Sequence, residues 1–122
     1  MKIKGDFIMT EDLNIEEDLI VKGNIYGKNG TRYNINARDI NALDIDAWNI
    51  YALDINAREI NAFDINYYAV CFAYKNINCK SIKGRRENCK HFVLDGKIKI
   101  EKDIPEFIEK DGYKYKLVEN EE

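Results

Sequence analysis

The sequence predicts an all-β fold in which short strands stack into a parallel solenoid, and a five-residue period is the main observation behind it. From Ile35 the chain divides into seven units, INARD, INALD, IDAWN, IYALD, INARE, INAFD and INYYA. Ile fills the first place of all seven and Ala the third place of the first six, while Asn or Asp fills the second place except at Tyr51. A period of five matches neither an α-helix nor an alternating strand. It fits a coil with one short strand and one turn per unit, in which places one and three point inward.

This pattern resembles the pentapeptide-repeat family, whose units have a small residue, then Asn or Asp, then a central Leu or Phe. The resemblance covers residues 34–68 and implies a right-handed, quadrilateral parallel β-helix with four units per coil. Relative to the family pattern, Ile and Ala exchange places here, but both still face inward, so that the volume of the core is conserved. Four units per coil would stack residues that are twenty apart in the sequence.

Before the regular units, the five-residue phase is visible but incomplete. Ile15, Ile20 and Ile25 lie on it, and small Gly27 follows Ile25 by two residues, as the third place requires. We therefore expect the β-helix to begin near residue 13, with an irregular first coil.

After the regular units, Val70 continues the phase. A slip of two residues follows, and then INCKS and IKGRR repeat the form with Ile77 and Cys79, and Ile82 and Gly84, as inward pairs. We therefore expect the β-helix to cover residues 13–86.

The two ends of the chain are expected to cap the helix within a single domain of residues 1–122, because open solenoid ends expose unpaired strands and apolar core. The alternating residues 1–12 predict a leading strand. Residues 87–122 predict a C-terminal cap: HFVLDGKIKI predicts a hairpin through its Asp-Gly turn, IPEFIEK one helical turn near Pro105, and YKYKLV a last strand.

The fourth place of the units carries large apolar residues that should point outward. With four units per coil, Leu43 would lie beneath Phe63 and Trp48 beneath Tyr68. One interpretation is a face for binding another protein or for homodimerisation, because aromatic residues dominate interface energetics. The other is that a terminal segment covers these rings or that they lie flat on the surface. The predicted interaction face consists of Leu43, Trp48, Leu53, Phe63 and Tyr68.

Acidic residues recur along the same units and form a second candidate. Some pentapeptide-repeat proteins mimic DNA, so the resemblance makes a phage-type inhibitor of a nucleic-acid-processing enzyme an alternative function. The length of the acidic stretch disfavours mimicry, since its seven units span about 8 Å along the helix axis, whereas one turn of DNA spans about 34 Å. A solvated, turn-favouring face is the simpler interpretation. The predicted acidic face consists of Asp39, Asp44, Asp46, Asp54 and Asp64.

Basic residues concentrate after the regular units and form a third candidate. They allow direct nucleic-acid binding through residues 75–90, although no recognised binding motif accompanies them. A rim that neutralises the acidic units, in the same molecule or in a dimer mate, is equally consistent with the sequence. The predicted basic patch consists of Lys80, Lys83, Arg85, Arg86 and Lys90.

The remaining chemistry gives no indication of catalysis or of a cofactor. Cys71, Cys79, Cys89 and His91 could suggest zinc, but the spacing C-x7-C-x9-C-x-H lacks close CxxC pairs. His91 is the single histidine, and no nucleophile motif or phosphate loop occurs. We predict a non-enzymatic protein without cofactor, metal, small-molecule substrate or membrane partner. The N-terminus does not have the pattern of a signal peptide, and three cysteines, an odd number, argue against a closed disulfide framework. Together these features predict a cytoplasmic location.

Overall fold

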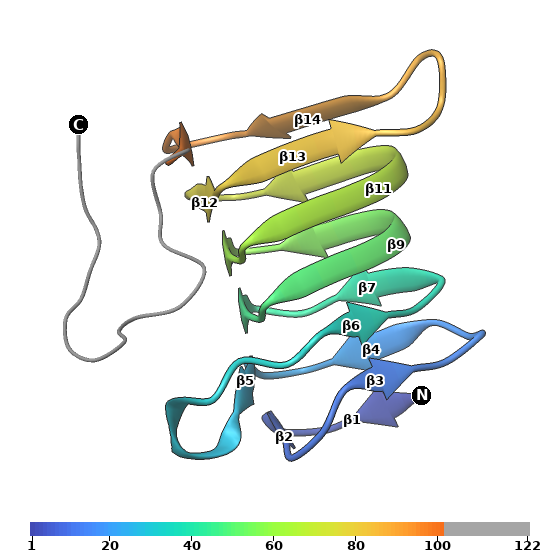
Figure 1. Cartoon of the computed structure of the whole chain (residues 1–122), viewed down its shortest axis with the longest axis vertical. Coiled ribbons are helices and arrows are strands. Elements are labelled where there is room, and N and C mark those ends of the chain that lie inside the picture. Colours follow the sequence, from blue (N-terminus) through green and yellow to red (C-terminus); the bar gives the residue numbers. More distant parts are fainter. Residues whose placement is uncertain (102–122) are drawn as a thin grey trace, which may run out of the picture.

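The chain forms a parallel β-helix, as expected. The computed structural model describes residues 1–101, which wind into a stack of short strands from β1 (Lys2–Ile3) to β15 (Ile98–Ile100) (Figure 1). Every strand pairing in this range is parallel. The helix therefore extends beyond the predicted residues 13–86 in both directions.

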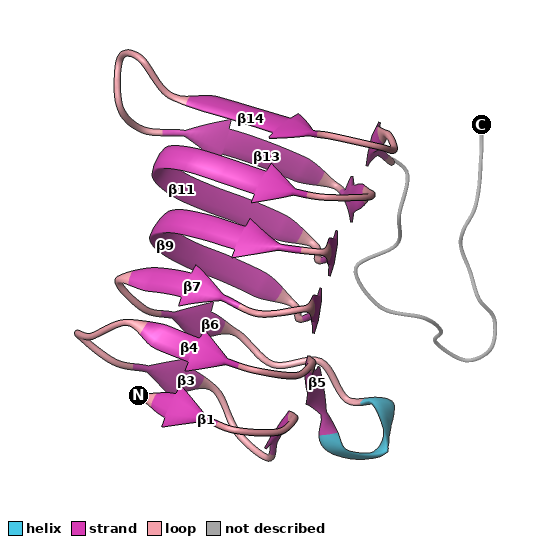
Figure 2. Ribbon diagram, turned by 180° about the vertical axis from the view of Figure 1, so that it is seen from behind, coloured by secondary structure: helices cyan, strands magenta, loops and turns pink. Residues whose placement is uncertain are grey.

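The β-helix has three faces, which the chain visits in a fixed order (Figure 2). The first face contains β3 (Leu13–Asn14), β6 (Ile35–Asn36), the first half of β9 (Asn49–Ala57), the first half of β11 (Asp64–Ala73) and β13 (Ser81–Gly84). The second face contains β1, β4 (Leu19–Val21), β7 (Asp39–Asn41), the second halves of β9 and β11, and β14 (Lys90–Val93). The third face contains β2 (Phe7–Met9), β5 (Ile25–Gly27), β8 (Asp44–Asp46), β10 (Glu59–Asn61), β12 (Ile77–Cys79) and β15. A short 3₁₀ helix, η1 (Lys28–Gly30), leaves the stack between β5 and β6.

The regular coils contain three units and not four, so the predicted quadrilateral cross-section is wrong. Ile35 pairs with Ile50, and Ile50 pairs with Ile65, a step of fifteen residues each time. The second and third faces have the same step between Ile40 and Ile55 and between β8 and β10. The described residues make about six turns, because the third face is a six-stranded sheet.

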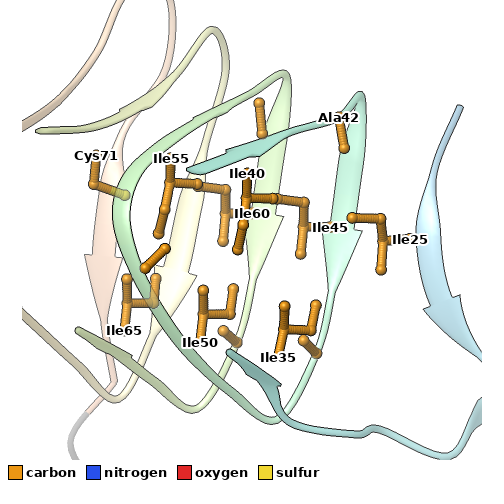
Figure 3. Packing of buried hydrophobic residues seen from close by; sticks show 14 of the residues in the cluster. Ile25, Ile35, Ile40, Ala42, Ile45, Ile50, Ile55, Ile60, Ile65 and Cys71 are labelled. Atoms are coloured by element: carbon orange, nitrogen blue, oxygen red, sulfur yellow. The ribbon is translucent and has the colours of Figure 1, made fainter. Parts of the chain in front are cut away.

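The exchange of Ile and Ala is consistent with the smaller coil. Ile lies in the middle of each side, where its branched side chain fills the interior, whereas Ala immediately precedes each corner. The inner angle of a three-sided coil is tighter than that of a four-sided one, and the small Ala side chain fits beside it. Figure 3 shows Ile35, Ile50 and Ile65 stacked in one such row.

These rows form the hydrophobic core. The inward Ile side chains of the regular units are at most 1% exposed, and the third-place Ala side chains are buried beside them. Burying an Ile side chain contributes about 1.5 to 3 kcal/mol relative to leaving it exposed. Each coil adds three such side chains, so stability accumulates along the stack.

The first coils depart from the predicted phase. Leu19 pairs with Ile40 and is buried, while Ile20 pairs with Asn41, which points outward. Ile20 was therefore predicted wrongly as an inward residue, because the chain has one residue more between β4 and β5 than between β7 and β8 in the next coil. The expectation for Gly27 is confirmed, since it is buried and a Cβ there would collide with the Thr31 carbonyl.

A register shift of one residue also separates β9 from β11. It occurs between Tyr67 and Val70, so that Cys71 and not Val70 pairs with Ile55 and enters the core. The prediction for Val70 is therefore wrong.

The inward pairs predicted after this shift are confirmed. Ile77 and Cys79 are fully buried, and Ile82 and Gly84 align with Ile65 and Tyr67 in the coil below.

The predicted caps prove to be coils of the helix itself. Residues 1–12 supply β1 and β2 of the first coil. The predicted hairpin is wrong, because β14 and β15 each pair in parallel with the coil below, and the turn at Asp95 carries the chain around a corner instead of reversing it. The helical turn predicted at 104–110 and the strand at 113–118 lie outside the described residues.

Candidate interaction surfaces

The fourth-place side chains lie at three corners of the helix, in columns with a step of fifteen residues. Backbone hydrogen bonds define these columns: the Leu53 N–H donates to the Arg38 carbonyl, and the Phe63 N–H donates to the Trp48 carbonyl. The first corner joins the first and second faces and contains Arg38, Leu53 and Tyr68. The second corner contains Leu43 and Arg58. The third corner contains Tyr33, Trp48 and Phe63.

The five residues of the predicted interaction face are therefore divided among three corners. Leu43 lies at the second, Trp48 and Phe63 at the third, and Leu53 and Tyr68 at the first. The predicted stacking of Leu43 with Phe63 and of Trp48 with Tyr68 is wrong, because it assumed a coil of twenty residues.

The third corner is a packed aromatic column. The Trp48 and Phe63 rings stack with centroids 4.4 Å apart and planes 10° from parallel. The Lys80 ammonium lies 4.7 Å from the centre of the Phe63 ring on the next coil. Phe63 is only 7% exposed as a result. These rings lie against the body of the helix, which agrees with a structural role.

The first corner is different, because its large side chains remain exposed. Tyr51, Leu53 and Tyr68 are 46%, 40% and 42% exposed. Arg85 joins the two tyrosines: its guanidinium lies 4.2 Å from the centre of the Tyr51 ring and 5.7 Å from that of Tyr68. The same guanidinium donates hydrogen bonds to the Tyr51 hydroxyl (2.9 Å) and to the Ala52 carbonyl (2.7 Å). We call Tyr51, Leu53, Tyr68 and Arg85 the aromatic corner.

A shallow apolar groove continues from the aromatic corner onto the second face. It has a volume of about 460 Å³, and Val70, Phe72 and Phe92 contribute its large apolar side chains, with Asp54 at its border. The Phe72 and Phe92 rings lie 4.9 Å apart. We call Val70, Phe72 and Phe92 the second-face groove.

Sequence reasoning missed Tyr51, Phe72 and Phe92 as members of one surface. Tyr51 gave a signal, since it breaks the run of Asn and Asp at the second place. Phe72 and Phe92 lie in the same outward column one coil apart, but neither belongs to a regular five-residue unit, so the repeat gave no signal for them. The step from Phe72 to Phe92 is twenty residues against fifteen in the regular coils, mainly because of the loop before β14.

The fifth-place Asn and Asp residues form ladders that hold the corners. The Asn34 side chain accepts the Asn49 N–H (3.1 Å), and the Asn49 side chain accepts the Asp64 N–H (3.2 Å). In the neighbouring column, Asp54 accepts the Val70 N–H (3.0 Å). A short side chain with an acceptor oxygen therefore satisfies one corner N–H in the next coil, which explains the recurrence of these residues.

The predicted acidic residues are spread over the helix and partly neutralised. Arg58 binds Asp44 through two hydrogen bonds of 2.8 and 2.9 Å, and this pairing holds the pKa of Asp44 below its usual value against the opposing effect of burial. Arg32 lies 2.7 Å from Asp46. Residues 19–79 carry six basic and six acidic side chains, a net charge of zero. This distribution does not favour mimicry of nucleic acid.

The predicted basic residues form a band around the last coil and not a patch. Lys80 is at the third corner, Lys83 on the first face, Arg85 and Arg86 after it at the first corner, and Lys90 on the second face. Lys80, Arg85 and Lys90 each lie over an aromatic ring. Their positive charge therefore surrounds one end of the β-helix.

A buried tyrosine organises the residues near this end. Tyr67 occupies a place that Ala fills in the coils below, and Gly84 above it leaves room for the ring. Its hydroxyl is 2.7 Å from His91 Nδ1. Burial, and then a hydrogen bond with Cys89, raise the pKa of Tyr67. Contacts within the molecule therefore account for the Tyr in place of Ala at this position.

The cysteines are separate free thiols. Cys71 and Cys79 are buried in the core, and burial raises their pKa values to about 12 and about 11. Across residues 1–101 no three His, Cys, Asp or Glu side chains gather in a way that could hold a metal ion. The same residues contain no helix with the length and apolar character of a membrane span.

Comparison with known proteins adds no relative: no family model, no curated protein and no solved structure matches this chain.

Proposed function

We propose that this protein is a non-enzymatic binding module that contacts another protein through the aromatic corner and the second-face groove. The observation that carries the proposal is the exposure of Tyr51, Leu53 and Tyr68 around a fixed Arg85. Tyr and Arg are enriched among the residues that dominate binding energy at interfaces. Arg85 is already held by two rings and a carbonyl, so little side-chain entropy remains to be lost on binding.

The surroundings of this surface indicate the chemistry of the partner. Val70 and Phe72 extend the apolar contact area, while Lys83, Arg86 and Lys90 border it with positive charge. A protein segment with an apolar side chain for the groove and carboxylates at its edge would match both features.

The proposal includes a relation to pentapeptide-repeat proteins and a cytoplasmic location. The five-residue phase of inward Ile and Ala supports the relation, although three units per coil depart from the four that the family implies. The three free thiols support a reducing compartment.

A capture experiment with matched variants tests the proposed surface. The full chain is immobilised and exposed to lysate of the organism of origin, beside Tyr51→Ser/Tyr68→Ser and the control Leu43→Ser. Leu43 is similarly exposed, at 42%, but lies at the second corner. We expect a protein that the wild type and the Leu43 variant retain and that the double variant loses, and its binding should be reproduced with the purified components. Equal retention by all three proteins, or no retention by any, would contradict the proposal.

A further inference from the structure

The charge of this protein is polarised along the axis of the β-helix. The first coil, residues 1–18, contains two basic and six acidic side chains, a net of −4. The last coil, residues 80–101, contains seven basic and three acidic side chains, a net of +4. The coils between them are neutral, so the two ends carry opposite charges of equal size.

Both ends also present unpaired strand edges. Within the described part of the chain, β1, β2 and β3 of the first coil pair only with β4, β5 and β6 above them. Likewise, β13 and β14 pair only with β11, and β15 pairs only with β12. Figure 1 shows these coils at opposite ends of the stack. Unpaired N–H and C=O groups in such edges can pair with a strand of another chain.

Apolar side chains of the core are accessible at each end. At the first coil Phe7 and Leu13 are only partly buried, and with Met1 they line a depression of about 230 Å³. At the last coil Val93 and Ile98 are partly buried against the core. Contact between two ends would remove this apolar surface from water.

We propose that the first coil of one copy stacks on the last coil of a second copy, continuing the β-helix head to tail. All strands on a face run in the same direction, so this arrangement extends the parallel pairing, whereas joining two identical ends would place opposed strands and like charges together. The acidic end meets the basic end, which favours this orientation. A head-to-tail contact uses two different surfaces and does not close by itself, so repeated addition forms an open row of copies.

The same chain contains a second candidate for contact with the basic end. Residues 102–122 follow β15 directly and contain four basic and seven acidic side chains, a net of −3. If they occupied this end in the full chain, a second copy would be excluded, and the experiment must distinguish the two outcomes.

The first measurement is the mass of the full-length wild type by light scattering or sedimentation over a range of concentrations. We expect the mass to rise with concentration beyond that of a dimer. It should fall when the salt concentration is raised from about 0.1 M to about 1 M, because salt screens the charges at the two ends. A strict monomer at every concentration would overturn the proposal and favour occupation of the basic end by residues 102–122.

Charge reversal at each end tests the orientation. Glu11→Lys/Glu16→Lys/Glu17→Lys changes the net charge of the first coil from −4 to +2, and Lys83→Glu/Lys97→Glu/Lys99→Glu changes that of the last coil from +4 to −2. Each variant then has two ends of like charge, and its association should weaken by about tenfold or more. An equimolar mixture of the two variants restores opposite charges at every junction, so association should return.

A control variant carries the same change of net charge away from the two ends. Lys22→Glu/Lys28→Glu/Lys75→Glu changes the net charge as much as the last-coil reversal does, but at η1 and the second corner, and should associate like the wild type. A mixture that stays monomeric, or reversed variants that associate like the wild type, would overturn the head-to-tail contact. If circular dichroism reveals that a reversed variant is unfolded, the corresponding Gln substitutions at the same positions replace it, with weakened association again expected.

Discussion

Replacement of Phe63 by Ala tests the three-unit coil directly, because it removes the ring that stacks on Trp48. Trp48 is the only tryptophan, so its fluorescence reports on this corner alone. In a coil of fifteen residues, Phe63 lies next to Trp48 with ring centroids 4.4 Å apart. In a coil of twenty residues, Tyr68 would take that place.

Three contributions determine the expected loss of stability. Burial of the Phe63 side chain, which is 7% exposed, contributes about 1.5 to 3 kcal/mol. The stacked pair adds about 0.5 to 1.5 kcal/mol, and the Lys80 ammonium over the ring adds about 0.5 kcal/mol. We expect Phe63→Ala to lower the free energy of unfolding by about 3 kcal/mol. Tyr68→Ala, at an exposed position, should cost less than about 1 kcal/mol.

The assay is urea denaturation followed by Trp48 fluorescence, with native emission spectra of both variants. Phe63→Ala exposes one face of the indole to water, so its native emission should move to longer wavelength and its urea midpoint should fall. Tyr68→Ala should leave the emission wavelength unchanged. A shift in the Tyr68 variant without one in the Phe63 variant would refute the fifteen-residue coil and support the twenty-residue one.

Three further predictions concern the ladders, the core and the thiols, all measured by urea denaturation. Asn49→Ala should cost about 1 kcal/mol because it leaves a corner N–H without its acceptor, whereas the exposed control Asn56→Ala should cost less than about 0.5 kcal/mol; equal effects would contradict the ladder. Ile50→Ala should cost about 2 to 5 kcal/mol, since the side chain is fully buried, and a smaller loss would indicate a loosely packed core. Burial raises the pKa of Cys71 from 9.0 to about 12, so the folded state keeps a proton that the unfolded state releases. The free energy of unfolding should therefore decline as the pH rises above 9.0. Cys71→Ala should reduce this decline, and an unchanged pH dependence would contradict the role of Cys71.

Within the regular units, the five-residue phase was sufficient to predict which side chains form the core, but not the size of the coil. Periodicity fixes the side of the strand on which a residue lies, and Ile50 and Ala52 are buried as expected. The number of units per coil depends on the angle of each corner, which no single unit encodes. The family resemblance implied four units per coil, whereas the strand pairing has three.

Register outside the regular units could not be predicted, because a single inserted residue reverses the side on which all following residues lie. The shift between Tyr67 and Val70 brings Cys71 inward in this way. At the other end, an additional residue at the corner between β4 and β5 does the same for Leu19 relative to Ile20. Such changes lie at corners, where Gly, Asn and Tyr are compatible with turns of several lengths.

The candidate surface was predicted in part. The five-residue unit determines whether a side chain points outward, whereas the length of the coil determines which outward side chains lie next to one another. Leu53 and Tyr68 were expected to be outward and are exposed. Their proximity to each other and to Arg85 requires the fifteen-residue step and the longer last coil.

Departures from the repeat distinguish structural residues from functional candidates. Tyr67 replaces an inward Ala, but Gly84 makes room for its ring and His91 bonds its hydroxyl, so the structure accounts for it fully. Tyr51 replaces an outward Asn, and almost half of its surface stays exposed even with Arg85 over its ring. Folding would be satisfied by Asn at this place, as it is at Asn36 and in most other units. The aromatic ring at position 51 is therefore the departure from the repeat that best supports the proposed contact with a partner.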